Sequence, residues 1–402
     1  MDSAQLLALI DAVRGRTVAV IGDVIADEFV YGRVARVSRE APVLILEYDS
    51  TEIVAGGGAN AANNVAALGG VASLVSLVGG DEPGTRLIRS LHRRVDRRHL
   101  VRARARTTTV KTRILAGGVH STKQQVVRID RGVGQTIGPR EKAAVERAAL
   151  AAAVDADAVL ISDYGSGLIT PAFVSRLRRS LRSEGVPIPI LVDSRYRLLE
   201  YRGLTACTPN ESEVEQALGI EIDDDPRVLE RAGRDVLART QMKAVLITRG
   251  GRGMALFQPN APTVHIPIVG SDEIADVTGA GDTVMATLAL ALAAGATFER
   301  AARLANHAGG VVVMKRGTAT VSADELRAAI TANEGRARLS VGADLKVRPY
   351  QAHEGRLKPA PTRTPEAAGS TSAGSAKARH AKAGHAKGVG AAFRRPGRSG
   401  RG

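Results

Sequence analysis

The chain has 402 residues, of which 44% are hydrophobic, with one cysteine and a formal net charge of +15. Its length suffices for one large α/β domain with a sizeable core, and a single cysteine excludes both an intramolecular disulfide framework and a cysteine-based zinc cluster. Most of the charge lies at the C-terminal end: residues 335–402 hold 15 Lys and Arg against 3 Asp and Glu, which leaves residues 1–334 at +3.

The N-terminal residues 1–16 predict an amphipathic helix and not a signal peptide. They carry Asp2 and Asp11 in place of a basic region, and their apolar positions recur at helical spacing. The most apolar run, Val284 to Ala296, falls short of the roughly 20 residues that a membrane span requires. We therefore expect a cytoplasmic protein that is not embedded in a membrane, which agrees with the cysteine usage.

Apolar, β-branched runs that end in polar or glycine residues alternate with helical patterns along the chain. The runs occupy residues 17–24, 72–79, 158–165, 189–195, 204–210 and 244–251. Such alternation is typical of βαβ units and predicts an α/β fold with a central, mostly parallel sheet flanked by helices. Ligands of these sheets bind at the carboxyl ends of the strands, where the polar residues of each run fall.

Two segments, residues 28–54 and 106–130, interrupt this alternation. Polar and β-branched residues alternate in both, which predicts antiparallel strands with one solvated face. We expect them to form a small antiparallel β lid over the strand ends of a single globular unit, residues 1–334. Residues 335–402, rich in Ala, Gly, Ser, Pro and Arg, are predicted to be a disordered basic low-complexity tail.

The sequence DVTGAGD, residues 276–282, precedes an Ala/Leu-rich helix. Its glycines allow the backbone to approach a ligand closely, and free N–H groups at a helix N-terminus stabilise an anion such as a transferring phosphoryl group. Asp282, in the first helical turn, could accept the proton of an attacking hydroxyl. The alternative is that Asp282 is only an acidic residue that stabilises the helix N-terminus.

Two further motifs near the N-terminus have both a functional and a structural interpretation. Gly56-Gly57-Gly58 precedes a helix with Asn60 and Asn64 one turn apart, which suits sugar hydroxyls but also suits a glycine turn with a helix cap. Asp23 and Asp27 lie at and just after a strand end, where a carboxylate recognises hydroxyls or caps a turn.

Asn210 and Glu213, three residues apart after a strand, could contact a ligand or form a capping box. Thr248 followed by Gly250, Gly251 and Gly253 predicts a phosphate-facing turn or an ordinary hairpin. Neither a Walker A sequence nor a G-x-G-x-x-G motif opening the first βαβ unit is present, which disfavours P-loop and dinucleotide-binding folds.

Taken together, these motifs resemble the ribokinase-like (PfkB) carbohydrate kinase family over residues 15 to about 330. GGGANAANNVAALGG and DVTGAGDTVMATLALALAAG look like its two signatures. Within the family, the run Arg36 to Val43 (RVSREAPV), the sequence QQVVRID and the sequence ANHAGGVVVMKRGTATVS are similar to the D-glycero-D-manno-heptose 7-phosphate kinases. The resemblance implies ATP-dependent phosphorylation of the anomeric hydroxyl of that sugar phosphate, in ADP-heptose synthesis for a surface glycan such as lipopolysaccharide.

The resemblance also implies roles for individual residues. Asp282 would deprotonate the anomeric hydroxyl, and the anion hole would consist of Gly279, Ala280 and Gly281. The positions that match ATP- and Mg²⁺-contacting residues are Asn210, Glu213, Thr248, Gly250 and Asn306. Sugar contacts match Asp23, Gly57 and Asn60, and part of a monovalent-cation site, expected to take K⁺, matches Asp276 and Thr278.

For the 7-phosphate the candidates are Lys111, Arg113 and Arg128 in the lid, because a sugar phosphate requires basic partners. A solvated basic strand face is the alternative. The sequence VDSRYR, residues 192–197, stands where many relatives have Asp-Pro-Lys, which leaves the role of Arg195 open.

The expected partners are the sugar phosphate, ATP and a second copy of the chain bound through the lid. Because the chain has no H-x-G-H motif, the adenylyl transfer step is expected to belong to a separate adenylyltransferase. The rival functions are another PfkB-type kinase, acting on ribose, a ketose phosphate or ketodeoxygluconate, and a protein that binds nucleic acid through its tail. Nucleic-acid binding is disfavoured because only Tyr350 and Phe393 of the tail could stack on bases.

Overall fold

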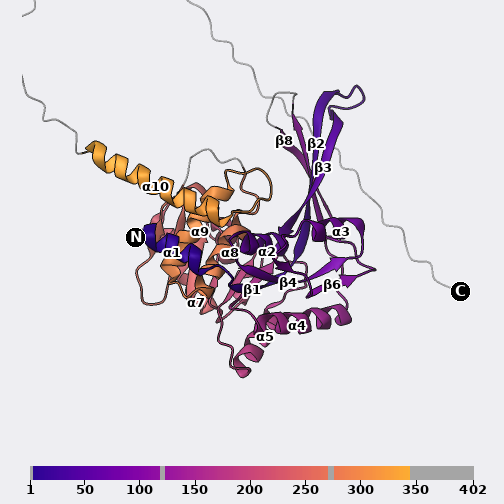
Figure 1. Ribbon diagram of the computed structural model, residues 1–402. Coiled ribbons are helices and arrows are strands. Elements are labelled where there is room, and N and C mark those ends of the chain that lie inside the picture. Colours follow the sequence, from indigo (N-terminus) through magenta and orange to yellow (C-terminus); the bar gives the residue numbers. More distant parts are fainter. Residues whose placement is uncertain (1–2, 118–122, 270–275, 345–402) are drawn as a thin grey trace, which may run out of the picture. The chain divides into compact units, whose positions relative to one another are not determined.

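The computed structural model describes residues 3–117, 123–269 and 276–344. Within these residues a ten-stranded sheet forms the centre of the protein (Figure 1). Along its main path the strand order is β14 (Val264–Ile266), β13 (Met254–Phe257), β12 (Ala244–Thr248), β11 (Ala206–Cys207), β10 (Ile190–Ser194), β9 (Ala158–Asp163), β1 (Thr17–Gly22), β4 (Val71–Gly79) and β5 (Val95–Asp96), and β6 (Leu100–Ala103) also pairs with β4. The predicted α/β fold with a mostly parallel sheet is confirmed.

Helices cover both faces of this sheet because its central strands are apolar on both sides. Val18 and Val20 of β1 pack into one core, and the alternate residues Ala19 and Ile21 pack into the other. The first core is covered by α1 (Ser3–Ala12), α2 (Gly58–Ala67), α3 (Glu82–Arg89), α8 (Ala280–Ala293), α9 (Phe298–Val312) and α10 (Ala323–Asp344). The second is covered by α4 (Pro139–Val154), α5 (Pro171–Ser183), α6 (Glu211–Leu218) and α7 (Pro226–Thr240).

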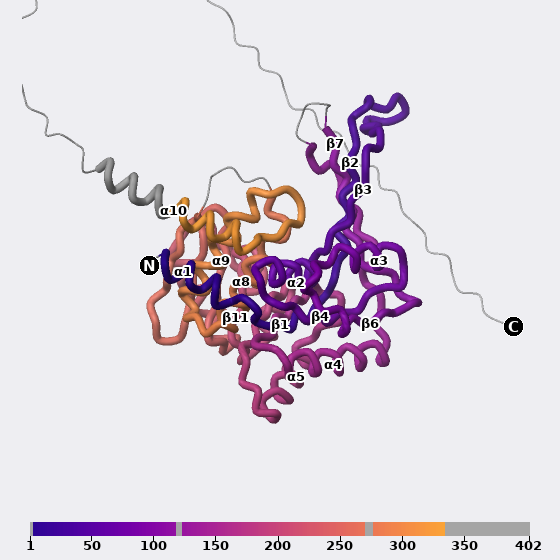
Figure 2. Tube along the Cα trace, in the orientation of Figure 1, coloured from indigo at the N-terminus to yellow at the C-terminus, as the bar shows by residue number. Residues whose placement is uncertain are grey.

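The N-terminal helix α1 packs against elements from the other end of the described chain. Leu6, Leu9 and Ile10 are its buried residues. Figure 2 shows α1 beside the C-terminal helices, and an ion pair joins Asp11 to Arg327 of α10. The predicted amphipathic helix is thus part of the domain core. None of the described helices combines the length and the apolarity that a membrane crossing needs.

One edge of the central sheet differs from a simple βαβ repeat. The strands β13 and β14 run antiparallel, beginning with the pairing of β12 with β13. A short 3₁₀ turn, Gly250–Arg252, connects β12 to β13, and Gly253 follows it with a φ of 79°. This glycine sequence therefore forms the hairpin that was one of its two interpretations, because it joins strands of opposite direction.

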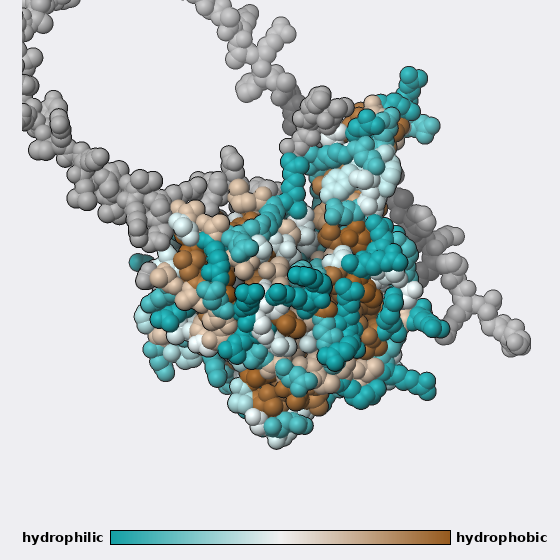
Figure 3. Space-filling view, viewed as in Figure 1, coloured by the Kyte–Doolittle hydropathy of each residue, from teal (hydrophilic) through white to brown (hydrophobic). Residues whose placement is uncertain are grey.

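A separate four-stranded sheet is formed by the two segments that interrupt the alternation. Its order is β3 (Leu44–Gly57), β2 (Val24–Val37), β7 (Val110–Gly117) and β8 (Gln124–Arg131). Both outer pairs are antiparallel, as predicted, and the central pair, β2 with β7, is parallel. The strand β8 is exposed along its whole length, and Figure 3 shows hydrophobic residues at the far end of this sheet among hydrophilic ones. Residues 118–122 of the predicted lid lie outside the described residues.

The C-terminal helix α10 extends beyond the expected domain boundary at residue 334 and ends at Asp344. Residues 334–339, Glu-Gly-Arg-Ala-Arg-Leu, are mostly good helix formers, which explains why the helix continues. Residues 345–402, the larger part of the predicted tail, lie outside the described residues.

Candidate active site

Two cavities meet at the carboxyl ends of the central strands. The larger one has a volume of about 460 Å³ and is lined by the ends of β9, β10 and β12 together with α8 and α9. The smaller one, about 160 Å³, lies between the start of β2, the strands β7 and β8, and the loop after β9. Tyr164 and Arg195 line both cavities. This position agrees with the expectation that ligands bind where parallel strands end.

Asp282 lines the larger cavity close to the place where the two meet. It lies in the first turn of α8 and is only 5% exposed. Its Oδ2 accepts a hydrogen bond from Asn60 Nδ2 at 2.9 Å, and its Oδ1 accepts one from the Tyr164 hydroxyl at 3.0 Å. Burial raises the pKa of Asp282 to about 7, although these hydrogen bonds act in the opposite direction. A carboxylate with a pKa near neutrality can act as a general base.

The glycine sequence before Asp282 forms the N-terminus of α8. Gly279 is the N-cap with a φ of 79°, and a Cβ atom there would lie 2.5 Å from Asn60 Nδ2, so only glycine fits. The Ala280 N–H donates to the Val277 carbonyl at 3.2 Å and is therefore already used. Among the described residues, Gly281 and Asp282 have no backbone acceptor for their N–H groups, so these are the donors available to an anion.

Asp276 shapes the loop that precedes α8. Its Oδ1 accepts from the Thr278 N–H at 2.9 Å and its Oδ2 accepts from the Gly317 N–H at 3.0 Å. Burial opposes ionisation, but these hydrogen bonds outweigh it and lower the pKa of Asp276 below its usual value. The two carboxylates of DVTGAGD therefore have different surroundings. Asp276 accepts hydrogen bonds from backbone N–H groups, whereas Asp282 faces the larger cavity.

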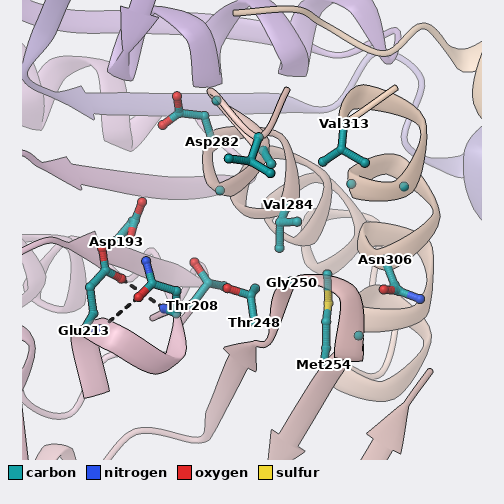
Figure 4. A pocket seen from close by; sticks show the side chains of 18 of the residues that line it. Asp193, Thr208, Glu213, Thr248, Gly250, Met254, Asp282, Val284, Asn306 and Val313 are labelled. Carbon is teal, nitrogen blue, oxygen red and sulfur yellow. Dashed lines mark hydrogen bonds between the residues drawn. The ribbon is translucent and has the colours of Figure 1, made fainter. Parts of the chain in front are cut away.

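The five positions expected to contact ATP and Mg²⁺ are brought together in the larger cavity (Figure 4): Asn210, Glu213, Thr248, Gly250 and Asn306. The capping box is also present, since Asn210 Oδ1 accepts from the Glu213 N–H at 2.8 Å and Glu213 Oε2 accepts from the Asn210 N–H at 3.0 Å. The capping-box interpretation of this pair is confirmed, and the cap leaves the Asn210 amide nitrogen and the second Glu213 oxygen available to a ligand in the cavity.

A second carboxylate, Asp193 at the end of β10, faces the same cavity near Glu213 (Figure 4). Burial, together with the charges of Glu213 and Asp282, raises the pKa of Asp193 well above its usual value, and burial raises that of Glu213. The described residues hold no group of three or more potential metal ligands. Two carboxylates beside an open cavity nevertheless fit Mg²⁺, which is usually held by one or two carboxylates, water and substrate phosphates.

The smaller cavity has an excess of positive charge. Its charged lining residues are Arg106, Lys111, Arg128 and Arg195 against Asp23 and Asp130. Arg128 is paired with Asp130 at 2.9 Å, whereas the side chains of Lys111 and Arg195 make no hydrogen bond or ion pair with the described residues. Burial and the nearby charge of Arg195 lower the pKa of Lys111. An anionic ligand would relieve this crowding of like charge.

Asp23 also lines the smaller cavity, but its carboxylate is well occupied. It accepts from the Tyr164 N–H at 2.9 Å, from the Ser166 N–H at 3.3 Å and from the Ser166 hydroxyl. Burial raises the pKa of Asp23, and the bonds from Ser166 offset part of that effect. Asp23 therefore anchors the 164–166 loop, in accordance with its structural interpretation, while its carboxylate remains at the cavity wall.

Three predicted substrate residues do not line either cavity: Gly57, Asn60 and Arg113. Asn60 is 1% exposed: its amide nitrogen donates to Asp282, and its amide oxygen accepts from Asn64. Gly57 has a φ of 59°, and a Cβ atom there would lie 2.7 Å from the Asp23 carbonyl oxygen. Arg113 Nη1 donates to Asp27 Oδ1 at 2.5 Å, because the parallel pairing of β2 with β7 puts the two residues on neighbouring strands.

Several residues of the site had no role predicted from the sequence, chiefly Tyr164, Asp193 and Arg106. Tyr164 follows β9 directly, and Asp193 lies in β10. The signal that drew attention to Asp23, a polar residue at a buried strand end, was therefore present for both. Arg106 precedes β7 and had no comparable signal.

Comparisons with known proteins bear on the family and the fold. The model of the pfkB family carbohydrate kinases matches residues 16–325. The bifunctional protein HldE of Caulobacter vibrioides is 42% identical over 338 residues, which is 83% of this chain and 67% of that protein. The HldE protein of Geobacter sulfurreducens is 42% identical over 309 residues, 76% of this chain and 61% of that protein. The chain thus spans about two thirds or less of the length of these relatives.

Solved structures show the same fold. An Escherichia coli phosphofructokinase-2 structure in complex with potassium has a TM-score of 0.62 at 18% identity, covering 80% of this chain and 99% of that one. Arabidopsis thaliana ribokinase complexed with ribose and ATP has a TM-score of 0.59 at 18% identity, covering 79% and 99%. With the family match over most of the described residues and relatives at 42% identity, the chain belongs to the PfkB family of carbohydrate kinases.

Proposed function

We propose that this carbohydrate kinase transfers the γ-phosphoryl group of ATP to the anomeric hydroxyl of D-glycero-D-manno-heptose 7-phosphate, as a step of ADP-heptose biosynthesis. The choice of sugar is supported by the resemblance of the SREAPV and QQVVRID sequences and by the HldE relatives, which are heptose kinase/adenylyltransferases. The single observation that supports a phosphorylated sugar as the substrate is the excess of cationic side chains in the smaller cavity.

The proposed reaction uses both cavities and the base where they meet. The acceptor hydroxyl oxygen attacks the γ-phosphorus from the smaller cavity, a new P–O bond forms, the bond to the leaving ADP oxygen breaks, and Asp282 takes the hydroxyl proton. The N–H groups of Gly281 and Asp282 stabilise the developing charge on the phosphoryl oxygens. Closure of the lid over the sugar would exclude water from the phosphoryl group.

We assign the nucleotide to the larger cavity. Thr248, Gly250 and Asn306 are proposed to contact ATP, and Asn210 and Glu213 are proposed to hold Mg²⁺ through water. When bound, Mg²⁺ would offset the charge of the ATP phosphates. Asp276 and Thr278 are proposed to form part of a site for a monovalent cation such as K⁺.

We assign the sugar phosphate to the smaller cavity. Lys111 and Arg195 have no ionic partner among the described residues, so they are the proposed contacts of the 7-phosphate, with Arg128 and Arg106 beside them. Asp23 is placed to contact a sugar hydroxyl. Arg113 is left out of this set because Asp27 neutralises it.

A panel of sugars scored by ADP release tests the proposed substrate. Heptose 7-phosphate should be turned over with the highest kcat/KM among heptose 7-phosphate, ribose, fructose 6-phosphate and ketodeoxygluconate. Robust turnover of ribose without turnover of heptose 7-phosphate would favour the alternative of a ribokinase-like activity. Turnover of a different sugar phosphate would keep the assignment of the smaller cavity and change the sugar.

The oligomeric state is also part of the proposal. We propose a homodimer formed through the small sheet, because β8 is exposed along its length with Val126 at 48%, Val127 at 44% and Ile129 at 47% exposure. Contiguous exposed apolar residues mark interaction surfaces. Replacing Val127 and Ile129 with Lys should give a monomer by light scattering. A dimer of unchanged affinity would exclude this surface.

Two expectations remain proposals about the whole protein. We propose that residues 345–402 form a basic tail that kinase activity does not require. A cytoplasmic location stays a prediction. The expected separate adenylyltransferase is not part of this proposal, because in the bifunctional HldE relatives the adenylyltransferase is fused to the kinase.

A further inference from the structure

The side chain of Tyr164 links the base to both cavities. Its hydroxyl donates to Asp282 Oδ1 at 3.0 Å, and its ring lines the larger and the smaller cavity alike. Of the two groups that hold the Asp282 carboxylate, Asn60 comes from α2 behind the base, and Tyr164 comes from the loop at the end of β9. The two donors therefore approach the carboxylate from different elements and leave it little freedom to rotate.

The position of Tyr164 is itself fixed from several sides. Its N–H donates to Asp23 Oδ2 at 2.9 Å, which anchors the backbone at the strand end. A Cβ atom at Gly57 would lie 3.4 Å from ring atom Cε2, so the glycine leaves room for the ring and little more. Lys111 Nζ lies 5.3 Å from the ring centroid, in a cation–π arrangement. The hydroxyl is thereby directed at Asp282 by packing, and not only by its own hydrogen bond.

A carboxylate offers about four lone-pair positions to donors. Asn60 and Tyr164 occupy one on each oxygen, so the remaining positions are available to an acceptor hydroxyl. Burial and the charge of Asp282 raise the pKa of Tyr164 well above its usual value, so the tyrosine stays a neutral donor while Asp282 is ionised. Tyr164 can therefore stabilise the ionised base throughout the working pH range.

We propose that Tyr164 is the positioning residue of the catalytic base: its hydroxyl orients the Asp282 carboxylate towards the acceptor hydroxyl and favours its ionised form. This inference rests on the proposed role of Asp282 and extends it to a residue that makes no covalent or proton-transfer step of its own. The other charged groups that act on Asp282 are Asp27, which disfavours its ionised form, and Lys111, which favours it, and Asp193 lies across the larger cavity.

The test is the pH dependence of kcat/KM for the sugar that the parent enzyme turns over, measured from about pH 5 to 9 for the parent and for Tyr164→Phe. The parent should lose activity below about pH 7, the pKa of Asp282. Tyr164→Phe removes a hydrogen bond that stabilises the ionised carboxylate, so the pKa of Asp282 should rise. The acid limb of the profile, which is the fall of kcat/KM at low pH, should therefore move up by about one pH unit, with activity partly recovered at high pH. Phenylalanine retains the ring and its contact with Lys111.

Tyr201→Phe provides a matched control. Tyr201 is 1% exposed and its hydroxyl donates to Asp163 Oδ2 at 2.6 Å, so the change removes the same kind of buried Tyr–Asp hydrogen bond at a carboxylate that is not the base. This variant should lose stability without a shift of the acid limb. If Tyr164→Phe gives the same unshifted profile, with only a uniform loss of activity, the inference is wrong and Tyr164 is merely structural.

A second substitution covers the case in which Tyr164→Phe does not fold. Site-specific replacement of Tyr164 by difluorotyrosine keeps the size and strengthens the donor, so the acid limb should move to lower pH, and an unmoved limb would overturn the inference. These outcomes are separable from the proposed function. Failure of the parent on heptose 7-phosphate concerns the sugar alone, whereas an unshifted limb in an active enzyme concerns Tyr164.

Discussion

Asp282→Asn is expected to lower kcat by about 10² to 10⁴-fold while leaving the Kd for ATP nearly unchanged. The variant keeps the shape of the side chain: its amide oxygen can accept from Asn60, and its amide nitrogen can donate to the Tyr164 oxygen. It lacks only the ability to accept the proton of the acceptor hydroxyl. Steady-state ADP release and isothermal titration with ATP measure the two quantities.

Asp157→Asn is a suitable control for this substitution. Asp157 accepts from the Thr17 N–H at 2.8 Å at the opposite, amino end of the strands, far along the sheet from the cavities. Its kcat should match that of the parent. Activity of Asp282→Asn within threefold of the parent would remove Asp282 from the role of base.

The pH dependence of stability should differ between the parent and Asp282→Asn. The folded-state pKa of Asp282, about 7, lies above its unfolded value, so the folded protein binds more protons than the unfolded chain between about pH 4 and 7. The free energy of unfolding therefore falls as pH rises through this window, by roughly 4 kcal/mol at 1.36 kcal/mol per unit. Asp282→Asn removes this loss, so its melting temperature should exceed that of the parent at pH 8 and approach it near pH 4. A pH-independent difference would contradict the raised pKa.

Lys111→Met is expected to raise KM for the sugar phosphate by about 10 to 100-fold, because a charge-assisted contact with a phosphate is worth about 1.5–3 kcal/mol. The KM for ATP should change little, since Lys111 lines the smaller cavity and not the larger one. Methionine keeps most of the apolar stem that packs near Tyr164. The measurement is steady-state kinetics with each substrate varied in turn.

Lys123→Met is the matched control for this second substitution. Lys123 directly precedes β8 of the same small sheet, but it pairs with Asp49 and lies 5.6 Å from the Tyr31 ring centroid, outside both cavities. It should leave both KM values unchanged. Equal effects of the two substitutions would show that the lid responds to charge in general, and that the smaller cavity does not bind the phosphate.

The sequence predicted the fold because the pattern of each segment is local. The β-branched runs at 17–24 and 158–165 appear as β1 and β9, and the alternating segments appear as the separate small sheet. What local patterns could not give was the parallel pairing of β2 with β7, since strand order depends on contacts between residues about 84 positions apart, such as Thr112 with Glu28.

The segment that most suggested a heptose substrate lies away from both cavities. Ser38, Glu40 and Val43 of SREAPV are in the turn between β2 and β3, at the far end of the small sheet, and Val43 is 56% exposed. The resemblance therefore identified relatives through a segment that contacts neither described cavity. A motif that marks a group of proteins need not be the part that touches the substrate.

Sequence by itself determined the α/β class, the glycine loop at a helix N-terminus and the candidate base, because helix propensity, strand patterning and the requirement for glycine at positive φ act over a few residues. Only the tertiary structure decided which side chains share a cavity. It placed Asn60 against Asp282, paired Arg113 with Asp27, and left Lys111 and Arg195 without an ion-pair partner among the described residues. These outcomes depend on burial and on distances between remote segments, which also set the pKa of Asp282, so they could not be read from any one stretch of the chain.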